Sequence, residues 1–154
     1  MPCLPTLTME IEAVIAEFEA IRAGLYQQVK KVIEANKEQI IKWNHDQLQQ
    51  GENAQGVELY TIGGTYSPSY LAQKIRKGKA KNAYTINLDL TGQFYSSWTI
   101  RVMADHFTIT ANDKIHGDSL YIRWKDVTGL NAEHLAELTK LVTDGIAQIL
   151  KGGK

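Results

Sequence analysis

Residues 66–113, YSPSYLAQKIRKGKAKNAYTINLDLTGQFYSSWTIRVMADHFTITAND, decide the fold of this chain. Within them, Ser67 followed by Pro68 predicts a short helix that runs to about Arg76, because serine caps a helix and proline suits its first position. The basic residues 77–82 then form a loop. No reactive group stands out in this stretch. It therefore indicates a scaffold for assembly rather than a reaction centre.

Strands are expected after the short helix. Alternation of apolar and polar residues predicts strands over residues 86–90, 94–103 and 106–111, with Ala104-Asp105 as a tight hairpin loop. Residues 119–124 are expected to complete the meander. The apolar residues that alternate along the first three runs are Ile86, Leu88, Leu90, Trp98, Ile100, Val102, Phe107 and Ile109.

The N-terminal third predicts a long helix. Thr8 can cap it, and apolar residues then recur every three or four positions. The five residues of this stripe that we expect to form an interface are Ile11, Ile15, Phe18, Ile21 and Leu25. Two arrangements are open: one long helix bent at Gly24, which we favour, or two helices, the second starting at Asn36 with Gln39 as its capping partner. A small domain cannot cover so long a helix, so part of the stripe needs another subunit.

Glycines mark the turns. Residues 51–66 form a polar loop with turns at Gly51, Gly56 and Gly63-Gly64. Thr91-Gly92 makes a corner at which glycine can adopt a positive φ.

A C-terminal helix is predicted over residues 130–150, with Asn131 as its cap. The order of elements predicts an α+β fold: a long N-terminal helix, a short helix, a small antiparallel meander or hairpin sheet, and a C-terminal helix. We divide the chain into an extended segment and helical arm, residues 1–50, and an α+β core, residues 51–154.

The bulk composition excludes several function classes. Lys and Arg number 17 against 17 Asp and Glu, so no global field draws the chain to nucleic acid or to a membrane. Its single cysteine, Cys3, is compatible with a reducing cytoplasm, and no membrane span or signal peptide is expected. No histidine pair has the spacing of a metal site; the histidines are His45, His106, His116 and His134. We expect no catalytic residues, no cofactor and no metal, and hence no enzyme.

The densest cluster of charge contains Lys74, Arg76, Lys77, Lys79 and Lys81. One interpretation is the solvated face of a mobile loop. The alternative is a DNA-facing patch, which would make the chain a small nucleic-acid-binding module that uses residues 74–81.

Five segments carry a resemblance through their order: QGENAQG (50–56), YSPSYLAQK (66–74), LDLTGQFYSSW (88–98), IRVMADHFTITAND (100–113) and GLNAEHLAELTKLV (129–142). This order resembles the virion-morphogenesis or tail-completion proteins of tailed bacteriophages, which act near the head–tail junction. The matching positions are Gly51, Gly56, Ser67, Pro68, Lys74, Thr91, Gly92, Ser97 and Gly129-Leu130-Asn131. The segment NDKIHGDSLYIRW (112–124) departs from the Tyr-Ala-x-x-His-x-Gly run that is usual in that family.

The resemblance implies a structural virion protein that forms a homo-oligomeric ring and turns over no substrate. Its implied partners are other neck, portal-side or tail proteins of the phage, with a passing contact to DNA and none to a membrane. It implies a location in the virion after synthesis in the cytoplasm of the bacterial host. Tail completion, tail termination and a place in the neck all stay open.

Overall fold

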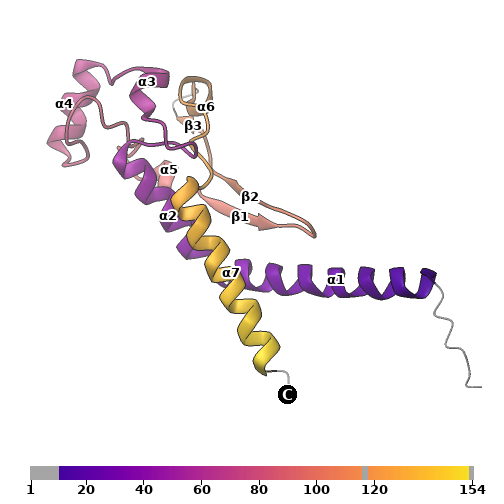
Figure 1. Ribbon diagram of the computed structural model, residues 1–154. Coiled ribbons are helices and arrows are strands. Elements are labelled where there is room, and N and C mark those ends of the chain that lie inside the picture. Colours follow the sequence, from indigo (N-terminus) through magenta and orange to yellow (C-terminus); the bar gives the residue numbers. More distant parts are fainter. Residues whose placement is uncertain (1–10, 116–117, 153–154) are drawn as a thin grey trace, which may run out of the picture.

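The computed structural model describes residues 11–115 and 118–152. Figure 1 shows an α+β fold in which long helices at both ends of the chain flank short helices and a β-hairpin. The predicted fold class is confirmed. The Thr8 cap and the extended segment before it lie outside the described residues.

Two helices, not the favoured single one, form the N-terminal third. Helix α1 (Ile11–Ala35) passes through Gly24, and α2 (Lys37–Gln50) leaves it at a sharp angle (Figure 1). The break falls at Asn36, whose side-chain amide donates to the Val32 carbonyl at 2.7 Å and makes no cap bond to α2. The predicted capping pair is therefore wrong, although the position of the restart is right.

The predicted loop 51–66 contains a short helix, α3 (Leu59–Gly63), that the sequence did not reveal. Leu59 is fully buried, and this burial anchors a helix too short to show a periodic pattern. Helix α4 (Pro68–Arg76) has the predicted bounds, and the Ser67 hydroxyl accepts from the Tyr70 amide at 3.4 Å.

The first predicted strand is absent from the described structure. Residues 86–89 are all buried, so the apolar and polar residues do not lie on two different faces as they would in a half-buried strand. The φ of Leu88 is 56°, in the left-handed region, which is incompatible with a strand. The start of the next predicted strand is also wrong, because helix α5 (Gln93–Ser96) occupies it.

The hairpin itself is confirmed. Strand β1 (Thr99–Val102) pairs antiparallel with β2 (Phe107–Thr110), and Val102 lies opposite Phe107. The Met103 amide donates to the His106 carbonyl at 2.7 Å, which leaves Ala104-Asp105 as the predicted loop.

The predicted meander strand over residues 119–124 is wrong. A short ladder of β3 (Lys114–Ile115) and β4 (Asp118–Ser119) leads instead into helix α6 (Leu120–Arg123). The helical turn brings Trp124 into the core, where it is 5% exposed.

Helix α7 (Ala132–Gly152) ends the described chain. Asn131 caps it as predicted, since its side-chain oxygen accepts from the His134 amide at 2.9 Å. Helix α7 crosses the C-terminal end of α1 (Figure 1), where a Cβ on Gly145 would lie 2.8 Å from a methyl group of Val32. Glycine at this position therefore permits the close approach of the two helices.

Two clusters of buried side chains form the core. The larger contains Leu48, Leu59, Tyr66, Ile86, Leu88, Phe94, Trp98, Trp124 and Val127. The smaller contains Ile33, Ile40, Ile100 and Leu138. Since α2 contributes to both, the predicted arm of residues 1–50 is too long: within the described residues, only the part of α1 before about residue 28 stands clear of the core.

Candidate assembly interface

The N-terminal half of α1 projects from the core with its apolar stripe uncovered (Figure 1). The five predicted interface residues range from 48% exposed at Leu25 to 72% at Ile11, and Phe18 is 69% exposed. The other two are Ile15 and Ile21. Contiguous exposed apolar surface of this kind is typical of a partner surface. We call residues 11–25 the arm.

The same helix is packed at its other end. Val32 and Ile33 are buried, and Val29 packs with them against the hairpin and α7. This contact anchors the arm to the core, so the exposed stripe starts from a fixed base.

The structural corner is built around Gly92, whose φ is 82° as the sequence predicts. The Gln93 amide donates to the Thr91 hydroxyl at 3.4 Å. The Ser97 hydroxyl donates to the Phe94 carbonyl at 2.7 Å and accepts from the Asn112 amide at 2.9 Å. Ser97 therefore joins α5 to the segment after the hairpin, whereas Thr91 is exposed and Gly92 and Ser97 are half-buried.

Lys74 is not DNA-facing, and the prediction for this residue is wrong. Its side chain is fully buried, with the ammonium 4.9 Å from the centre of the Tyr66 ring. Nζ donates to the side-chain oxygen of Asn87 at 2.8 Å and to the carbonyl of Asp89. Burial lowers the pKa of this ammonium to about 8.

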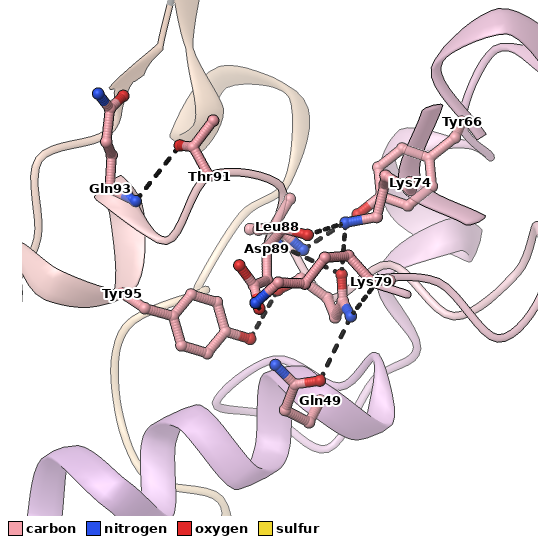
Figure 2. A network of polar contacts seen from close by, with 10 residues as sticks. Gln49, Tyr66, Lys74, Lys79, Leu88, Asp89, Thr91, Gln93 and Tyr95 are labelled. Atoms are coloured by element: carbon pink, nitrogen blue, oxygen red, sulfur yellow. Dashed lines mark hydrogen bonds and ion pairs between the residues drawn. The ribbon is translucent and has the colours of Figure 1, made fainter. Parts of the chain in front are cut away.

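Figure 2 shows how the polar groups around Lys74 hold the chain between α4 and α5. The Tyr66 hydroxyl accepts from the Leu88 amide at 3.0 Å, and the Tyr95 hydroxyl donates to the Asn87 carbonyl at 2.7 Å. The Asn87 side-chain amide donates to the Lys79 carbonyl at 3.0 Å and to Gln49 of α2 at 3.3 Å. These bonds stabilise the left-handed Leu88 and fix the loop that follows α4.

The remaining basic residues divide into two kinds. Lys79 forms an ion pair with Asp89 at 2.9 Å. Arg76, Lys77 and Lys81 are exposed, and no ion pair involves them within the described residues. The cluster thus contains one buried cation, one paired cation and three on the surface.

Three described histidines lie in different places. His45 packs 4.5 Å from the Tyr95 ring, and burial lowers its pKa. His134 bonds to the Gln47 oxygen at 2.8 Å. The side chains of His106 and Asp105 form a hydrogen bond of 2.6 Å on the exposed hairpin turn. In the part of the chain that the structure describes, no group of His, Cys, Asp and Glu could hold a metal ion, and no helix could cross a membrane.

Sequence reasoning missed two buried amides, Asn44 and Gln47, that tie α2 to the segment before α7. Asn44 accepts from the Gly129 amide at 2.9 Å, and Gln47 accepts from the Asn131 amide at 2.9 Å. Both occur at helical spacing after the buried Ile40. Polar residues in a position that continues an apolar stripe were the signal that could have revealed them.

Comparison of the chain with protein-family models, with curated proteins and with solved structures gave no match.

Proposed function

We propose that this protein is a structural virion protein of a tailed bacteriophage that oligomerises as a ring component at the head–tail junction. The observation that carries the proposal is the arm: an anchored helix with an exposed apolar stripe. At 1.5 Å per residue, the 25 residues of α1 extend over about 37 Å. This length takes the stripe well beyond the reach of its own core.

The energetics support self-association through the arm. Complete burial of an exposed large apolar side chain contributes about 1.5–3 kcal/mol. Each of the five stripe residues, which are 48–72% exposed, can gain roughly half to three quarters of that value. Association costs about 4–15 kcal/mol in lost translational and rotational freedom. Several stripe residues buried together can therefore exceed that cost, whereas one or two cannot.

The order of motifs supports the place in the virion. The segments that resemble tail-completion proteins include the Ser67-Pro68 helix start, the Thr91-Gly92 corner and the Asn131 cap, each of which has a defined structural role in this fold. A scaffold of this kind serves assembly with neck, portal-side or tail proteins and needs no catalytic group. The proposed ring serves tail completion, tail termination or the neck.

The test is to change Ile15 to Ser and Phe18 to Glu in one variant, I15S/F18E. A matched control, A16S/A20E, introduces the same side chains on the opposite side of the helix. We expect wild type and control to sediment as oligomers, and I15S/F18E to be a folded monomer that no longer joins particles. Unfolding of I15S/F18E would instead place the arm in the monomer's core, and a monomeric wild type would refute the proposal.

A further inference from the structure

The end of α4 and the loop after it carry exposed apolar residues and exposed cations close together in the sequence. Ile75 is 54% exposed and Tyr84 is 61% exposed. The exposed Arg76, Lys77 and Lys81 lie beside them in the sequence. We call these five residues the basic end. Figure 1 shows α4, which leads into the basic end, on the far side of the molecule from the start of α1.

Hydrogen bonds hold the basic end in place. The Lys79 amide donates to the Lys74 carbonyl at 2.9 Å, and Asn87 grips the Lys79 carbonyl at 3.0 Å. Asn82 accepts from the Tyr84 amide at 2.8 Å, and the Tyr84 ring packs against Tyr60 at 5.4 Å. The cations therefore stand on an ordered loop, which lowers the entropy lost when a partner binds.

The arm has the opposite charge. Glu12, Glu17 and Glu19 are exposed, and Arg22 is the sole cation among residues 11–25. At 3.6 residues per turn, Glu12 and Glu19 border one side of the apolar stripe and Glu17 borders the other. Arg22 lies within the stripe, so three carboxylates against one cation leave the arm with a net charge of −2. An apolar strip with acidic borders is complementary to an apolar surface with cations around it.

We propose that the arm of one copy docks on the basic end of the next copy, an inference that rests on the proposed self-association through α1. The two surfaces differ and lie on opposite sides of the molecule, so the contact is heterologous. Each pair retains one open arm and one open basic end, and copies add until a ring closes.

Two other occupants fit less well. Packing of one arm on another would bring the acidic borders of both helices together, which is unfavourable. Nucleic acid on the basic end would meet only three exposed cations, because Lys74 is buried and Lys79 is paired with Asp89. We therefore commit to a second copy of this chain.

The experiment combines two variants that each disable one surface. I15S/F18E has a disabled arm and an intact basic end. R76E/K77E/K81E has an intact arm and a disabled basic end. A control with the same change in charge is K114E/K125E/K140E, at exposed lysines elsewhere. Each protein is analysed alone and in an equimolar mixture by sedimentation velocity, after circular dichroism has confirmed folding.

We expect R76E/K77E/K81E to self-associate at least about tenfold more weakly than wild type, because charge reversal opposes docking. I15S/F18E should stay monomeric, because its arm has lost two large apolar side chains. An equimolar mixture of the two should give a one-to-one pair that grows no further, since only one junction can form. The control should assemble as wild type does. Wild-type assembly should also weaken as salt increases.

Several results would overturn the docking proposal and still separate it from the proposed function. If R76E/K77E/K81E assembles normally while I15S/F18E is monomeric, the arm is an interface but the basic end is not its acceptor. Normal assembly with loss of salt-dependent binding to a short DNA duplex would assign the basic end to nucleic acid. A monomeric wild type would refute both proposals. Should the triple variant fail to fold, R76Q/K81Q serves in its place, with the same outcomes decisive.

Discussion

Helices α1 and α2 have similar apolar patterns, but the apolar side chains of α2 are buried whereas most of those of α1 are exposed. In α2, Ile40 and Leu48 are fully buried, whereas in α1 the stripe from Ile11 to Leu25 is exposed. A break at Asn36 separates the two and turns α2 into the core. The comparison teaches that a periodic stripe specifies a face to be covered, while tertiary packing decides whether the chain covers it itself. The stripe that the chain leaves open is then available to another molecule.

The largest difference between the two helices should appear when one leucine in each is changed to alanine. Leu48→Ala should destabilise the monomer by about 2–5 kcal/mol, because Leu48 is fully buried. Leu25→Ala should change its stability by less than about 0.5 kcal/mol, because Leu25 is 48% exposed. Urea unfolding of dilute, monomeric protein measures both. Equal losses would show that the arm is part of the monomer's core.

Parts of the fold were predictable because local rules decide them. Ser67 caps a helix, Gly92 adopts a positive φ, and Ala104-Asp105 turns a hairpin whichever neighbours surround them. The strand predicted over residues 86–90 failed because its residues are buried on every side and Leu88 is left-handed, a conformation held by distant tyrosines. Long-range bonds of this kind leave no periodic trace in the sequence.

The residues proposed as sites from the sequence also divide into those whose surroundings were predictable and those whose surroundings were not. Exposure of the Ile11–Leu25 stripe follows from the length of α1, and its residues were predictable. The burial of Lys74 was not, because its partners Asn87 and Asp89 lie 13 and 15 residues away and approach only after the chain has folded back. From the sequence alone, a lysine at the end of a basic helix is expected to be exposed to solvent.

The contrast between buried and exposed positions extends to the cations, because Lys74 is buried whereas Arg76, Lys77 and Lys81 are on the surface. In the folded chain the pKa of Lys74 is lowered to about 8, from 10.5 in the unfolded state. Between these values the unfolded state binds more protons, so stability increases with pH across that window. The neighbouring Asp89 and Lys79 contribute opposing smaller effects on this pKa.

Above about pH 10 the tyrosines reverse the trend. Burial raises the pKa of Tyr66, Tyr70 and Tyr95, so the unfolded state releases their protons first and stability falls with pH. Thermal melts from pH 7 to 11 should therefore show a maximum between the two regimes.

Lys74→Met should abolish the increase in stability with pH that Lys74 causes, and should retain the decrease above about pH 10 that the tyrosines cause. It should also destabilise the protein by about 1–3 kcal/mol at pH 7, since the Asn87 side-chain oxygen and the Asp89 carbonyl lose their donor. Lys77→Met is the control, because its side chain is exposed. A rise that persists in Lys74→Met would assign the titration to another group.

The smallest effects should come from the loop lysines, and they sharpen the boundary between core and surface. Lys77→Ser with Lys81→Ser should leave the free energy of unfolding within about 0.5 kcal/mol of wild type, because both side chains are exposed. Lys79→Ser should lose up to about 1 kcal/mol, because it removes the ion pair with Asp89 at 2.9 Å. The triple variant, in which Lys77, Lys79 and Lys81 are all changed to serine, should therefore lose no more free energy of unfolding than Lys79→Ser alone. Chemical denaturation at low and high salt separates the two contributions, since screening weakens the ion pair and leaves the effect of the other lysines near zero. A larger loss from Lys77 and Lys81 than from Lys79 would mean that the outer loop is packed against the core, and that the basic end is not free to receive an arm.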